Sequence, residues 1–111
     1  MKKMHLTDVK EVFEMMPERF NSDAARELDA VFQFDITGDS GGAWVLLVRD
    51  GVCEVREETH GNPNVSLSMT GDTWLSILNK ELNAVQAFLS GRLKISGDMM
   101  LAQKIPDLFT L

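Results

Sequence analysis

Residues 31–57 read VFQFDITGDSGGAWVLLVRDGVCEVRE, and this stretch decides the fold. Its first part alternates apolar and polar side chains, with Phe32, Phe34 and Ile36 on one face, which is typical of a strand buried on one side. A glycine-rich turn and an unbroken apolar run at residues 44–48 follow. This order predicts two strands that pair as an antiparallel hairpin.

A second turn signal lies at Asp50-Gly51. Both central positions of a type I′ turn need a positive φ, which aspartate tolerates and glycine adopts freely. The turn leads from the apolar strand into a third strand at residues 52–57. We therefore predict a three-stranded antiparallel meander at the centre of the chain.

Helical patterns precede this meander. Asp8 and Glu11 form a capping box, and the apolar residues that follow recur at helical spacing as far as Pro17. Ser22 is a cap candidate for a second short helix that continues to Leu28. Two helices are therefore expected before the first strand.

Strand and helix patterns alternate after the meander. Residues 65–70 alternate as a fourth strand, and residues 93–96 are predicted to form a short fifth strand. Three residues have the side chains and positions of helix caps: Asp72, Asn83 and Asp98. The last of these helices is expected to stop at Pro106. This order along the chain, with helices before and after an antiparallel meander, predicts an α+β fold.

The composition and charge of the chain exclude several classes of function. The 111 residues, 44% hydrophobic and 25% charged, predict one globular domain over residues 1–111. A net charge of -6 argues against a nucleic-acid partner. The longest apolar run, Ala43–Val48, is too short to span a membrane, and no export signal is visible. A single cysteine, Cys53, excludes an intramolecular disulfide and fits a reducing cytoplasm.

The segment Gly38–Gly42, GDSGG, matches the nucleophile signature of chymotrypsin-like serine proteases. That chemistry needs a histidine base oriented by a buried carboxylate, on a much longer chain. The only histidines are His5 and His60. We interpret the segment as a hairpin turn, with Ser40 as a turn residue, and predict no catalytic residue.

No other group of residues predicts chemistry. The two histidines and Cys53 lack the spacing of metal ligands, and the glycines do not form a phosphate-binding loop. We therefore expect no metal, no cofactor and no enzymatic activity. The seven methionines favour ordinary core packing over a ligand pocket when taken alone.

Residues 82–102, LNAVQAFLSGRLKISGDMMLA, carry a family resemblance. Together with FDITG at 34–38, GGAW at 41–44 and LSMTGDTW at 67–74, this segment resembles the sterol carrier protein 2 family of lipid-binding domains. The similarity extends over nearly the whole chain. It implies a five-stranded, mostly antiparallel sheet covered on one face by helices, with an apolar tunnel between the layers.

The resemblance implies a function without catalysis, namely binding or transfer of a fatty acid, an acyl-CoA or a sterol-like lipid. The residues expected to line the tunnel or core are Trp44, Leu46, Met69, Trp74, Leu78, Phe88, Met100 and Ile105. The chain ends in Phe109-Thr110-Leu111 without a peroxisomal Ser-Lys-Leu address, which favours a cytoplasmic protein.

Three positions depart from the family pattern. Lys80 and Met100 stand where the family has glycine, and Ala84 where proline is common. A methionine at position 100 is expected to fill part of the tunnel. The alternative function is therefore an accessory module with a filled core that docks on a partner protein or a second copy. An enzyme acting on acyl thioesters is a third, less favoured interpretation.

Overall fold

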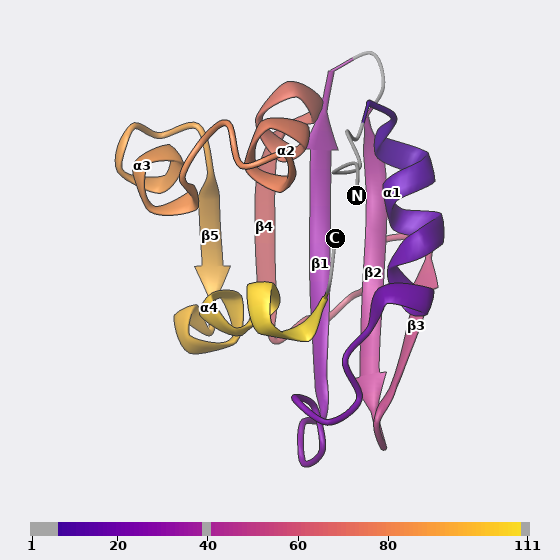
Figure 1. Cartoon of the computed structure of the whole chain (residues 1–111). Helices are drawn as coiled ribbons and strands as arrows, with labels where there is room; N and C mark the ends of the chain where they lie inside the picture. Colours follow the sequence, from indigo (N-terminus) through magenta and orange to yellow (C-terminus); the bar gives the residue numbers. More distant parts are fainter. Residues whose placement is uncertain (1–6, 39–40, 110–111) are drawn as a thin grey trace.

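The computed structural model describes residues 7–38 and 41–109. The helices and strands, in chain order, are α1 (Val9–Met15), the 3-10 helix η1 (Met16–Arg19), β1 (Ala30–Thr37), β2 (Gly42–Arg49), β3 (Val52–Arg56), β4 (Val65–Thr70), α2 (Gly71–Leu78), α3 (Ala84–Leu89), β5 (Lys94–Gly97) and α4 (Met99–Leu108). Helices α1, α2 and α4 lie on one face of the sheet (Figure 1). The predicted α+β class and the helical layer are confirmed.

The sheet has five strands in the order β3-β2-β1-β4-β5, so β1 is central. The pairs β1/β2, β2/β3 and β4/β5 are antiparallel, which confirms the meander. Strand β4, however, does not continue the meander, because it pairs parallel to β1 with Phe34 beside Leu67. A parallel pairing needs a crossover connection, and here the segment between β3 and β4 supplies it.

The crossover segment, residues 58–64, passes behind β2 and β1 on the face opposite the helices (Figure 1). Gln33 of β1 holds it there although its side chain is only 2% exposed. The Gln33 Oε1 accepts from the His60 N–H at 2.7 Å, and Nε2 donates to the Glu58 carbonyl at 3.4 Å. At the end of the crossover, Asn64 Oδ1 accepts from the Val31 N–H at 2.7 Å and aligns β4 with β1.

Most of the helix caps are the residues that the sequence predicts. The Asp8, Asn83 and Asp98 side chains accept backbone N–H groups at the starts of α1, α3 and α4, as predicted. The cap of α2 is Thr70 instead of Asp72, because Thr70 Oγ1 accepts from the Thr73 N–H at 3.2 Å. Helix α2 thus begins directly after β4, with no loop between them.

Two further expectations about helices are wrong. Residues 22–27 form turns instead of a helix, because the Ser22 hydroxyl donates to the Gly51 carbonyl at 2.8 Å instead of capping. Pro106 lies inside α4 and does not stop it. The helix continues to Leu108, which is buried and whose carbonyl accepts from the Asn21 N–H at 2.7 Å.

The Asp50-Gly51 turn has the predicted geometry, with φ of 53° and 75° at its two central residues. The GDSGG turn is only partly described, since Asp39 and Ser40 lie outside the described residues. His5 also lies outside them. The role expected for Ser40 as a turn residue stays a prediction.

Candidate functional site

The apolar layer between sheet and helices is closed beneath α1. Phe13 stacks on Trp44 with ring centroids 4.6 Å apart and on Trp74 with centroids 5.4 Å apart. Leu46 and Met69, on the helix-facing side of β2 and β4, are also buried. The structure therefore brings four of the predicted residues, Trp44, Leu46, Met69 and Trp74, into a packed core.

The layer is less completely covered over β4 and β5. Six aliphatic residues that pack against the core here are only partly buried: Leu78, Leu82, Ile95, Leu101, Ala102 and Ile105. We call them the β4–β5 apolar surface. Helix α2 lies against β4, and α4 lies against both β4 and β5. Side chains that remain partly in water gain free energy when an apolar ligand covers them.

Sequence reasoning identified only part of this surface. Leu78 and Ile105 were predicted, but the other four were missed, namely Leu82, Ile95, Leu101 and Ala102. A signal was present for two of the missed residues. Leu101 and Ile105 are four residues apart on α4 and share a face, while Ile95 shares the parity of the buried Leu93.

Two of the predicted residues lie at the outside of the layer. Phe88 is 39% exposed and Met100 is 72% exposed. The expectation that Met100 fills the space between the layers is therefore wrong for this structure. The reason is helical geometry, since Leu101, Ile105 and Leu108 form the inward face of α4 and Met100 precedes that face by about 100° of helix rotation.

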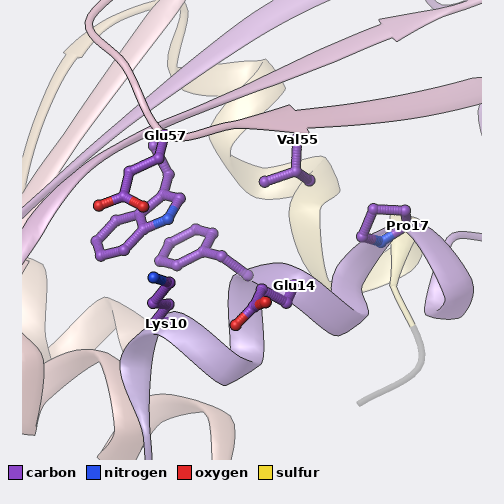
Figure 2. A pocket seen from close by; sticks show the side chains of 7 residues that line it. Lys10, Glu14, Pro17, Val55 and Glu57 are labelled. Carbon is purple, nitrogen blue, oxygen red and sulfur yellow. The ribbon is translucent and has the colours of Figure 1, made fainter.

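A separate cleft of about 370 Å³ lies between α1 and the strands β2 and β3 (Figure 2). The residues that line it are Lys10, Phe13, Glu14, Pro17, Trp44, Val55 and Glu57. Its volume is at the lower end for small-molecule sites. Glu14 and Glu57 outnumber Lys10, so the mouth of this cleft disfavours an anionic headgroup. The sequence alone could not predict the cleft, because its walls meet only through the tertiary fold.

The ionisable groups of the described residues provide neither an activated thiol nor a cluster of metal ligands. Burial raises the pKa of the Cys53 thiol to about 12, so the neutral thiol predominates at neutral pH and is a poor nucleophile. Within residues 7–38 and 41–109 there is no group of three or more His, Cys, Asp or Glu side chains that could hold a metal ion. The apolar layer is therefore the feature with the clearest binding potential.

These features define a class of protein: an α+β domain with a mixed five-stranded sheet and an apolar layer between the sheet and the helices. The model of the SCP-2 sterol transfer family matches residues 9–110, and the chain belongs to that family. None of the helices in the described ranges is long and apolar enough to cross a membrane.

Relatives carry this domain in chains of different length. Mouse hydroxysteroid dehydrogenase-like protein 2 is 33% identical over 97% of this chain, which spans only 22% of that relative. The palmitated sterol carrier protein 2-like 2 from Aedes aegypti has a TM-score of 0.74 at 25% identity, covering 91% of this chain and 93% of that one. The sec-alkylsulfatase Pisa1 from Pseudomonas sp. has a TM-score of 0.77 at 22% identity, covering 90% and 16%.

Proposed function

We propose that the chain binds one apolar lipid molecule at the β4–β5 apolar surface and serves in lipid transfer. The observation that carries this proposal is the uneven closure of the apolar layer. Phe13 is fully buried beneath α1, whereas Leu78, Ile95 and Ile105 remain partly exposed over β4 and β5. Membership of the SCP-2 sterol transfer family supports a lipid as the ligand.

A fatty acyl chain is the ligand class we favour. The similarity to the palmitated Aedes aegypti protein supports it. Each acyl methylene removed from water contributes about 0.8 kcal/mol, so micromolar binding, about -8 kcal/mol, requires roughly ten buried methylenes, a number that a long acyl chain supplies. Binding of such a ligand needs no catalytic group and no metal.

Titration of the protein with a fluorescent fatty acid, followed by displacement with palmitate, tests the proposal. We expect saturable, competable binding. Ile105→Trp places a large ring on the β4–β5 apolar surface and should weaken affinity at least tenfold. Val55→Trp is the matched control, because Val55 is also half-buried but lines the cleft beside α1. If only Val55→Trp weakens binding, the ligand lies in that cleft and our site is wrong.

A second candidate function is an accessory module that docks on a partner protein. The stack of Phe13 between two tryptophans favours it, because these three rings fill the centre of the layer beneath α1. Mouse hydroxysteroid dehydrogenase-like protein 2 also carries the matching region as only 22% of its length. Native mass spectrometry of the purified chain separates the two functions. A co-purified lipid supports binding, whereas a chain that carries none and takes up none supports the module.

A further inference from the structure

Large exposed apolar residues are concentrated at one edge of the molecule. Five of the six in the described ranges lie on α3 and the first turn of α4: Val85, Phe88, Leu89, Met99 and Met100. We call these five residues the apolar edge. The sixth, Val52, lies on β3, the strand at the opposite edge of the sheet. Such clustering marks an interaction site more often than scattered exposed residues do.

The apolar edge flanks strand β5, which is the outermost strand on its side (Figure 1). Helix α3 precedes β5 and α4 follows it. Val85 and Leu89 are four residues apart on α3, so they share one helix face, and they are 65% and 77% exposed. Ala87, fully buried, anchors the same helix to the core.

The charge at this edge is opposite to that of the rest of the chain. Residues 83–98, which form α3, β5 and the cap of α4, contain Arg92 and Lys94 but only one acid, Asp98, although the whole chain carries a net charge of -6. The Asp98 carboxylate already accepts the N–H groups of Met100 and Leu101 at 3.0 and 3.3 Å.

From this combination we infer that the apolar edge docks on the surface of an anionic phospholipid bilayer. Exposed aliphatic and thioether side chains beside basic residues are typical of interfacial membrane binding. Val85 and Leu89 enter the boundary between headgroups and acyl chains, while Arg92 and Lys94, both exposed, contact the lipid phosphates. The inference goes beyond the proposed function, since it concerns a bilayer surface and not the bound lipid molecule.

Sedimentation with phosphatidylcholine vesicles, with and without 30% phosphatidylserine, tests the inference. We expect the wild-type chain to prefer the anionic vesicles. Arg92→Gln with Lys94→Gln should lower the partition coefficient at least tenfold, since each basic residue at such a surface contributes about a fivefold factor. Val85→Glu with Leu89→Gln should lower it by a similar factor. Val52→Glu, at the opposite edge and similarly exposed, should leave it unchanged.

Three results would overturn the inference. They are equal binding to neutral and anionic vesicles, an equal loss of binding in Val52→Glu, and a concentration-dependent dimer that only Val85→Glu with Leu89→Gln abolishes. The last result would assign the apolar edge to a second copy of the chain. Fatty-acid uptake measured without vesicles should be unaffected by the Val85 and Leu89 changes. Failure of docking is therefore distinguishable from failure of the proposed lipid site.

Discussion

Phe13 lies flat against Trp44, with their ring planes 6° apart and their centroids separated by 4.6 Å. On its other side Phe13 stacks on Trp74, at an interplanar angle of 13°. The stack joins α1 to β2 and α2, which are far apart in sequence. It fills the part of the apolar layer beneath α1, whereas Leu78, Ile95 and Ile105, over β4 and β5, are only partly buried.

We expect Phe13→Ala to lower the free energy of unfolding by about 3 to 5 kcal/mol, because it removes a fully buried ring and leaves a cavity between two tryptophans. Urea denaturation followed by tryptophan fluorescence measures this change. Leu89→Ala is the control, since a 77% exposed side chain should alter stability by no more than about 0.5 kcal/mol. Equal effects of the two changes would contradict the stack as a major stabilising contact.

Gln33 offers a second test, because its buried amide holds the crossover segment. Gln33→Leu leaves the His60 N–H and the Glu58 carbonyl without their partner, which should cost about 1 to 3 kcal/mol. Hydrogen exchange should become faster at the His60 amide. The Leu93 amide, which donates to the Ala87 carbonyl at 3.0 Å, should keep its exchange rate and serves as the internal control.

The sequence predicted the strands well because their signals are local. The alternation of Phe32, Phe34 and Ile36 and the turn at Asp50-Gly51 each depend on a few neighbouring residues. The parallel pairing of β1 with β4 could not be predicted this way, because it depends on contacts between Gln33 and a segment about 25 residues later. The predicted helix cap at Ser22 was wrong for the same reason, since the Ser22 hydroxyl donates to the distant Gly51 carbonyl.

The candidate site was predictable only in part. Residue type and parity place Trp44 and Met69 in the apolar layer, and the structure agrees. They do not show which parts of the layer are closed, because closure depends on how α1 packs against α2 and the sheet. The outward position of Met100 could have been inferred from the spacing of Leu101 and Ile105. The family pattern, which has glycine at position 100, pointed to the tunnel instead.

Cys53 should show a pH-dependent stability. Its folded pKa is raised from 9.0 to about 12 by desolvation, so burial favours the protonated thiol. The stabilisation from the neutral thiol is fully present below pH 9 and is lost as the pH rises from about 9 to 12. Cys53→Val should flatten this part of the stability profile, measured by urea denaturation. Iodoacetamide should modify the wild-type thiol slowly at pH 8 and rapidly in guanidinium chloride, whereas equal rates would contradict its burial.

Lys80 occupies the position after the C-cap of α2 with a φ of 62°. Glycine is preferred there, because an L side chain is strained in the left-handed region. Lys80→Gly should therefore raise the free energy of unfolding by up to about 1 kcal/mol. Lys80→Ala removes the same charge but keeps a Cβ atom, and it should give no gain. Equal stabilisation by both variants in thermal denaturation would assign the effect to charge instead of backbone strain.

Met100→Gly distinguishes a position inside the lipid site from one on the apolar edge. Because Met100 is 72% exposed, its removal should leave no cavity, and stability should fall only by about 0.5 to 1 kcal/mol through lower helix propensity. Affinity for fatty acids of increasing chain length should stay unchanged in solution, whereas binding to anionic vesicles should weaken several-fold. Met100→Ala, which also loses the thioether but keeps helix propensity, should weaken vesicle binding equally with little loss of stability. Tighter binding of the longer fatty acids by Met100→Gly would instead show that Met100 narrows the ligand space.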